Sequence, residues 1–337
     1  NLSKKGKLFK PRDAKLFKPR NSLGNTGGQF YVAKNPTYGA VFTYHLKDVP
    51  KTSKSKRIQS ERKLNSDKKD VPFPGYKALS DEMNENPASI ILTIKDSNGN
   101  LINNVKKNAS NGSGRIAWNL RHKSYYPIRS GSFRGGWGWS PSGPYATPGD
   151  YQAELFLENN GSIEKLDGPI NFSVKPLRES TLKGASYDEY NRFRERVSGL
   201  FINISKYEDV FSIIGNKIQL LEKASMQLES FSPDIIAKIS DFKDRYNDYE
   251  YENDSSPARD EIGEWYKPNL GARIRIAMQG LSTSYGPTEL NSSNLEIAEK
   301  HFEKMKNEVE QLNKEVKDLE NEVKQLNPPY IIGQGID

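Results

Sequence analysis

The side chains that most often do chemistry are scattered along this 337-residue chain rather than grouped. Its three histidines, His45, His122 and His301, lie in different segments, with no second histidine or carboxylate at metal-ligand spacing. There is no Gly-x-Ser-x-Gly elbow, no P-loop, no dinucleotide fingerprint and no His-Glu-x-x-His motif. We therefore expect no catalytic residues, no metal and no cofactor.

Weaker patterns do not change this expectation. The acidic pairs Asp248/Glu250 and Glu252/Asp254 lie in a hydrophilic stretch with nothing to raise a carboxyl pKa, as a glycosidase acid requires. Residues 96–100 superficially resemble a calcium loop, but glycine is fourth rather than sixth and no glutamate is twelfth. The chain has no cysteine, which excludes disulfides, thiolate metal sites and thiol catalysis.

One segment does have the composition of a binding loop. Residues 121–150, the aromatic segment, combine tyrosine, tryptophan and phenylalanine with many glycines and serines. Binding groups often lie on loops held by a rigid scaffold. Such aromatics either stack on sugar rings, anchor a protein partner, or pack against the chain itself. The candidate ligand- or partner-binding residues are Tyr125, Tyr126, Phe133, Trp137, Trp139 and Tyr145.

The segments around this loop have the pattern of β-strands. Apolar residues alternate at Ile90, Leu92 and Ile94, and again through Trp118 and along 151–157, with glycine- and asparagine-rich turns between them. Asn98-Gly99 suits a hairpin turn. The spacing predicts an α+β multidomain chain whose first folded domain is an antiparallel Ig-like β-sandwich over residues 30–177.

Two segments flank or interrupt that sandwich. Residues 1–29 contain the sequence KLFKPR twice, at Lys7–Arg12 and Lys15–Arg20, and are expected to form an extended arm. This arm either connects domains or adds an edge strand elsewhere. Residues 47–70 are strongly basic and are expected to be a solvated helix or linker. They lack the interleaved aromatics that nucleic-acid binding would favour, so no nucleic acid is expected.

The pattern changes to helix after Pro176. Apolar residues recur at spacings of three and four from Tyr190 to Leu221 and from Phe302 to Leu326. Two such seams predict a long antiparallel helical hairpin or bundle over residues 185–327, followed by an extended tail over 328–337. Coiled-coil dimerisation between chains is the alternative.

Composition sets further limits. The net charge of +7 permits contact with anionic surfaces, although a well-solvated surface with a basic bias explains it more simply. No apolar run approaches the roughly 20 residues that a transmembrane helix needs. The chain begins at Asn1 without a signal-peptide pattern, so we expect it to be a piece or processed form of a longer protein.

Several segments together resemble a known family. The chain is similar to the C-terminal region of exported Bacteroidetes proteins with an N-terminal sortilin-type or BNR (Asp-box) β-propeller, which are often labelled glycosyl hydrolases. Its sandwich portion also resembles the Ig-like domain of flagellar hook-capping proteins. The segments that carry the resemblance are Asn35–Asp48, Val71–Tyr76, Glu85–Asn100, Gly114–Arg121, Gly143–Leu155, Ile170–Leu177 and Tyr285–Leu290.

The resemblance implies an accessory role. It implies a propeller preceding residue 1 in the same chain, export to the periplasm, outer membrane or cell surface, and protein partners in an envelope assembly. The Asp-box repeats themselves are absent here, so the hydrolase label has no residue to attach to. We expect a non-catalytic interaction region. A carbohydrate-binding or glycoside-hydrolase-associated module using the aromatic segment is the alternative.

Overall fold

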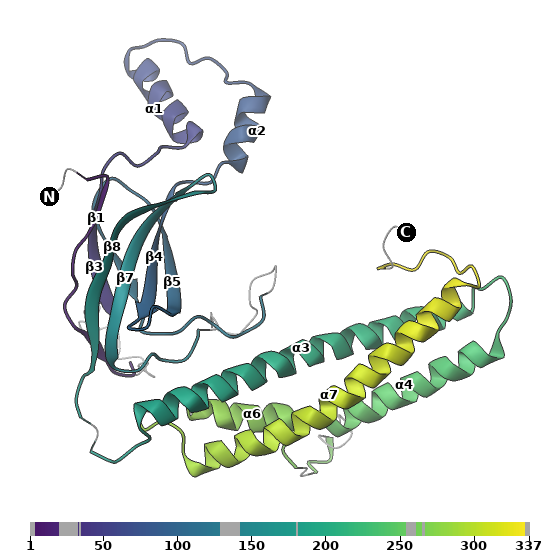
Figure 1. Cartoon of the computed structure of the whole chain (residues 1–337). Coiled ribbons are helices and arrows are strands. Elements are labelled where there is room, and N and C mark those ends of the chain that lie inside the picture. Colours follow the sequence, from purple (N-terminus) through teal and green to yellow (C-terminus); the bar gives the residue numbers. More distant parts are fainter. Residues whose placement is uncertain are drawn as a thin grey trace. The chain divides into compact units, whose positions relative to one another are not determined.

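The computed structural model describes residues 4–19, 33, 35–128, 142–179, 181–253, 261–264 and 267–333. It divides into two compact units. The sheet unit comprises Asn1–Ser124 and Ser142–Thr181, and the helical unit comprises Tyr125–Pro141 and Leu182–Asp337. Figure 1 shows strands in the first unit and long helices in the second.

The described strands form two sheets. The three-stranded sheet has the order β1-β3-β6, with antiparallel pairing throughout. The five-stranded sheet has the order β2-β8-β7-β4-β5. The strands are β1 (Gly6–Leu8), β2 (Ala14–Leu16), β3 (Ala40–Leu46), β4 (Ser89–Asp96), β5 (Leu101–Asn108), β6 (Gly112–Trp118), β7 (Gly149–Asn159) and β8 (Ser162–Pro176).

Each copy of the KLFKPR repeat supplies a strand of the sheet unit. The first copy contributes to β1, which pairs with β3, and the second contributes to β2, which pairs in parallel with β8. Leu8 and Ala14 are buried in the core. The prolines that follow cannot donate to a ladder, which suits the short edge strands seen here. The expected extended arm is therefore a part of both sheets.

One hydrophobic core lies beneath both sheets. It includes Phe42 from the smaller sheet, and Ile90, Leu155 and Phe172 from the larger one. The rings of Phe42 and Phe172 meet edge to face with centroids 5.1 Å apart. Trp118 is fully buried and also contacts Phe172. The period-two alternation of the sequence thus places its apolar side chains on the faces that meet.

A bend in the longest strands curls the larger sheet. The pairing of β7 with β8 shifts register between Ala153 and Phe156, opposite Gly168, whose φ of 106° favours glycine. Nearby, Asp167 accepts from the N–H of Leu8 at 2.8 Å and pairs with Lys7 at 2.9 Å. Burial alone would raise the pKa of Asp167, but these donors hold it below its usual value. The bend therefore also attaches β1 to β8.

The expected antiparallel Ig-like, hook-capping-protein-like sandwich is wrong. Because β2 runs parallel to β8, the five-stranded sheet is mixed, and it is curled rather than being one flat half of a sandwich (Figure 1). Six helices accompany the two sheets in the described residues. Alternation of apolar residues shows which positions are buried, but it does not distinguish parallel from antiparallel neighbours.

Two helices lie between β3 and β4. They are α1 (Ser53–Ser66), within the basic segment 47–70, and α2 (Tyr76–Asn84). The Thr52 side chain caps α1 by accepting from the N–H of Ser55. Neither helix contains a buried residue.

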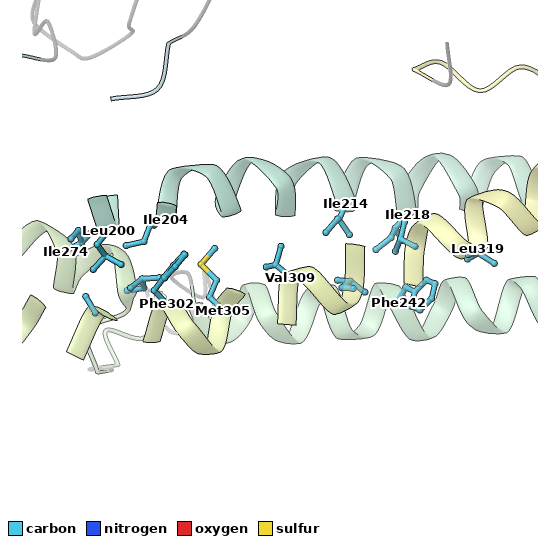
Figure 2. Packing of buried hydrophobic residues seen from close by; sticks show 14 of the residues in the cluster. Leu200, Ile204, Ile214, Ile218, Phe242, Ile274, Phe302, Met305, Val309 and Leu319 are labelled. Carbon is cyan, nitrogen blue, oxygen red and sulfur yellow. The ribbon is translucent and has the colours of Figure 1, made fainter. Parts of the chain in front are cut away.

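The described helices of the helical unit are α3 (Tyr187–Ser225), α4 (Pro233–Asn253), α6 (Leu270–Gln279) and α7 (Glu289–Lys324). Reciprocal capping bonds start the two longest helices, between Ser186 and Glu189 for α3 and between Thr288 and Asn291 for α7. Both expected seams are buried in one core, to which α4 adds Phe242 and α6 adds Ile274 (Figure 2).

The expected antiparallel hairpin is also wrong. Three side-chain pairs join α3 to α7: Arg196 with Glu299, Tyr207 with Glu310, and Lys217 with Glu320. Positions later in α3 meet positions later in α7, so these helices run parallel. The returning element is α4, whose Lys238 and Arg245 pair with Glu322 and Glu315 of α7 in the opposite order.

The two seams share their core with the shorter helices of the same chain. The two seams do not form a separate two-stranded coil, because Ile235 and Ile239 of α4 and Leu270 of α6 share their interior. Beyond α7 the described chain continues to Gly333, and Ile331 packs into this core. In the described residues, no helix is long and apolar enough to cross a membrane.

Two glycines of α3 provide a test of this packing. A Cβ at Gly215 would lie 2.6 Å from the Tyr246 ring, whereas a Cβ at Gly199 would meet nothing within 4 Å. We expect Gly215→Ala to destabilise the chain by about 1–3 kcal/mol through overpacking. Gly199→Ala should stabilise it by up to about 1 kcal/mol through helix propensity. Chemical denaturation of both variants checks this, and equal stabilisation by the two would contradict the α3–α4 contact.

Candidate binding site at the base of the aromatic segment

The two ends of the aromatic segment are held together by backbone pairing. Arg121 and Tyr145 form an antiparallel bridge. On either side, the N–H of His122 donates to the carbonyl of Pro144 at 2.9 Å, and the N–H of Ala146 donates to the carbonyl of Leu120 at 2.8 Å. Gly143 is required here, since a Cβ would lie 2.3 Å from the His122 carbonyl oxygen. The base of the segment therefore has a defined shape.

The backbone at Arg121 is also fixed from behind. The buried indole of Trp118 donates its Nε1–H to the Arg121 carbonyl at 2.8 Å, and Asn103 Nδ2 donates to the same oxygen at 3.0 Å. The N–H of Lys123 donates to Ile102 at 2.9 Å. These bonds attach the base to β5 and β6, so the Arg121 side chain starts from a rigid support.

Four side chains then meet at this base. The Arg121 guanidinium carbon lies 3.8 Å from the centroid of the Tyr145 ring, and Lys18 Nζ lies 5.4 Å from the same centroid. Arg121 Nη1 also donates to the carbonyl of Gly143 at 2.9 Å. Tyr38 belongs to the same group, because it interacts electrostatically with Tyr145 and Arg121. Its ring also meets that of Phe17, the neighbour of Lys18, with centroids 4.9 Å apart. We call Lys18, Tyr38, Arg121 and Tyr145 the cation–tyrosine cluster.

Burial changes the protonation equilibria of this cluster. Desolvation, aided by the charge of Arg121, lowers the pKa of Lys18 to about 8. Desolvation also raises the pKa of Tyr38 to about 12, although the Phe17 backbone nearby partly opposes this. Within the described residues, Lys18 Nζ and the Tyr38 hydroxyl are buried without a hydrogen-bond partner. Burying a polar group without a hydrogen bond costs free energy, so a ligand that supplies the missing bond would be stabilising.

This arrangement suits anion binding rather than catalysis. Lys18 and Arg121 are both cationic at neutral pH, and neither forms an ion pair with a carboxylate of the described residues. A bound carboxylate would accept from the ammonium and the phenol and would offset the repulsion between the two cations. In the described ranges, no three His, Cys, Asp or Glu side chains lie close enough to hold a metal.

A hollow in the helical unit offers less. It has a volume of about 220 Å³ and is lined by residues that include Ile213, Leu220 and Ile332. Its two charged side chains, Lys217 and Glu320, already pair with each other at 2.6 Å. Apart from this ion pair and Asn216, its lining is mostly apolar, so it offers few groups that would orient a ligand.

The structure separates the residues that the sequence grouped as candidates. Tyr145 lies in the cluster. Tyr125 and Tyr126 stack with centroids 5.3 Å apart and contact Phe201 of α3 within the helical unit. Phe133, Trp137 and Trp139 lie outside the described residues.

Sequence reasoning missed Lys18, Tyr38 and Arg121. The only sequence signal was the repetition of KLFKPR, which places Lys10 and Lys18 at equivalent positions. Lys10 is exposed while Lys18 Nζ is buried. Nothing in the repeat itself distinguishes the two, because the difference arises from the strand that each copy pairs with.

Comparisons with known proteins add no identity. No family model and no curated protein matches the chain. A solved structure titled pT26-6p aligns at 12% identity over 86% of this chain and 46% of its own, with a TM-score of 0.13. The chain thus spans less than half of that neighbour, and similarity at this level carries no argument.

The Lys18 ammonium gives a direct test of the cluster. It should titrate near pH 8 rather than at 10.5. Because the unfolded chain then binds this proton more tightly, Lys18 should add stability as pH rises from about 8 to 10.5. NMR of the chain with isotope-methylated lysines would measure the titration, with Lys18→Arg identifying the signal. A titration at 10.5 would contradict the described burial.

Proposed function

We propose that this chain is a non-catalytic interaction region that binds an acidic group of a protein partner at the cation–tyrosine cluster. The observation that carries the proposal is the pair of cations, Lys18 and Arg121, over one tyrosine ring without a carboxylate partner in the described residues. An aspartate or glutamate side chain is the protein group with the matching charge and acceptors.

The donors of the cluster match the acceptor atoms of a carboxylate. Arg121 has one donor engaged with Gly143, which orients the rest of its guanidinium. Lys18 and Tyr38 supply further donors whose positions are fixed by β2 and by the Phe17 contact. A carboxylate bound by these donors would offset the cost of two partly desolvated like charges, and this relief would favour binding.

The wider setting of the proposal rests on the sequence resemblance. The chain would follow an N-terminal β-propeller in the same polypeptide, support it, and act in an exported protein of the periplasm, outer membrane or cell surface. Its protein partner would belong to an envelope assembly. Of the cluster residues, Tyr38, Arg121 and Tyr145 belong to the segments that carry the resemblance, whereas Lys18 does not.

The glycan-binding alternative has weaker support from the described residues. The Tyr145 ring is already covered by Arg121, and Tyr125 and Tyr126 pack on each other and on Phe201. A ring that stacks on a sugar needs a free face. Trp137 and Trp139, the other candidates, lie outside the described residues.

A paired peptide experiment tests the proposal. Immobilised peptides rich in Asp and Glu are compared with the same peptides carrying Asn and Gln. We expect the chain to bind a subset of the acidic peptides, and amide replacement to weaken binding at least about tenfold because the charge-assisted bonds are lost.

The repeat offers a matched control for this experiment. Lys18→Met should abolish the difference between acidic and amide peptides, and Lys10→Met, at the equivalent exposed position, should preserve it. Arg121→Gln should weaken acidic binding in the same way as Lys18→Met. Acidic binding that survives Lys18→Met, or equal binding of the amide peptides, would refute the proposal.

A further inference from the structure

A second surface of the sheet unit is independent of the cluster. The two helices between β3 and β4, α1 and α2, have no buried residue in either helix. They project from one end of the strands, where Figure 1 shows them as a separate pair. We call residues 51–85 the helical projection. Most helices in folded proteins are stabilised by burying an apolar face, so this pair is unusual.

Charge and hydrogen bonds hold the projection together instead. Arg57 of α1 makes two bonds of 2.8 Å to the Glu82 carboxylate of α2, and it also reaches Glu61 at 2.6 Å. The side chain of Glu85 accepts from the N–H of Ser53 at 2.6 Å, where α1 begins. These bonds fix the two helices without covering their outer surfaces.

Three large apolar side chains are exposed on α2 and just before it, among polar neighbours such as Lys77 and Asp81. Phe73 is 64% exposed, Tyr76 84% and Met83 87%. Phe73 and Tyr76 meet edge to face with centroids 5.1 Å apart. Tyr76 and Met83 are seven residues apart in one helix, so they share a face. Large apolar side chains that are exposed together on and beside a projecting helix indicate contact with a membrane or another molecule.

The neighbouring helix supplies positive charge. Residues 51–70 contain eight basic and three acidic residues. Of the three acids, Glu61 is occupied by Arg57. Six exposed cations of this segment form no ion pair with the described residues: Lys54, Lys56, Arg62, Lys63, Lys68 and Lys69.

We propose that the helical projection docks on the surface of an anionic lipid membrane. Phe73, Tyr76 and Met83 would enter the interfacial layer while the lysines of α1 remain among the headgroups. Basic residues combined with exposed aromatic and apolar side chains are typical of helices that lie at a membrane surface. Each lysine near such a surface contributes about 1 kcal/mol at most, so several are needed.

The shape of the projection favours lipid over a folded partner. Phe73, Tyr76 and Met83 are each more than half exposed, so a protein partner would need a hollow that matches them. A fluid interface accepts protruding side chains without such a match. The cations are likewise spread over 16 residues of sequence, from Lys54 to Lys69, and mobile headgroups can follow them, whereas a rigid acidic surface would need fixed spacing.

Vesicle sedimentation of the full chain tests this inference. We expect binding to phosphatidylcholine vesicles that contain about one third phosphatidylglycerol, and little binding to phosphatidylcholine alone. Raising the salt from about 0.05 M to about 0.5 M should weaken binding at least tenfold, because the Debye length then shortens. Phe73→Ser combined with Met83→Ser should weaken it by a similar factor.

Matched control variants distinguish docking through the helical projection from nonspecific binding by exposed apolar side chains. Met226→Ser combined with Phe231→Ser removes side chains that are 68% and 74% exposed in the helical unit, and binding should be unchanged. Circular dichroism should show equal helix content in all variants, because the substituted side chains are exposed. Absence of binding to the anionic vesicles, or equal loss in both double variants, would overturn the inference. So would salt-sensitive binding that persists in Phe73→Ser with Met83→Ser.

Discussion

The parallel pairing of β2 with β8 is the interaction on which the sheet unit depends. It aligns Ala14–Leu16 with Val174–Pro176, and the N–H of Leu177 extends the ladder to the Leu16 carbonyl at 2.9 Å. This single pairing makes the larger sheet mixed. It also ends where Phe17 and Lys18 leave the strand, and thereby places them against Tyr38 and Tyr145. Fold and candidate site therefore share one cause.

The sequence indicated the local structure of this unit better than its topology. Alternation located β4, whose Ile90, Leu92 and Ile94 are all buried, and it identified Trp118 as a core side chain. It did not reveal that the KLFKPR copies enter different sheets, because each strand has only three residues and its partner lies far along the chain. Of the predicted site residues, Tyr145 lies in the cluster. Lys18 and Arg121 looked like ordinary surface cations, since their burial depends on long-range contacts.

The helical unit illustrates the same limit. The spacing of apolar residues located both seams, and Val197, Ile218, Val309 and Leu319 are buried as that spacing requires. The spacing of apolar residues, however, does not show whether two helices run parallel or antiparallel. The orientation of α7 was decided by α4, a return helix of 21 residues, which brings the chain back toward the start of α3 before α7 begins. The constant offset from Arg196–Glu299 to Lys217–Glu320 records the parallel alignment that results.

Unpaired positive charge connects the two proposals. Carboxylates of the sheet unit form ion pairs that join neighbouring strands, as Glu154 does with Lys95 and Lys165. Lys18, Arg121 and six exposed cations of residues 51–70 form no ion pair with the described residues, whereas Arg57 of the same segment pairs with Glu61 and Glu82. A positive charge left without an internal acid is available to an external anion.

The most direct measurement is the Lys18 pKa with and without a saturating acidic peptide. The account predicts that the value rises from about 8 when the peptide binds, because a carboxylate then stabilises the ammonium. Thermodynamic linkage requires this shift if the carboxylate contacts Lys18. An unchanged Lys18 pKa in the peptide complex would contradict the account, since the acid would then bind elsewhere.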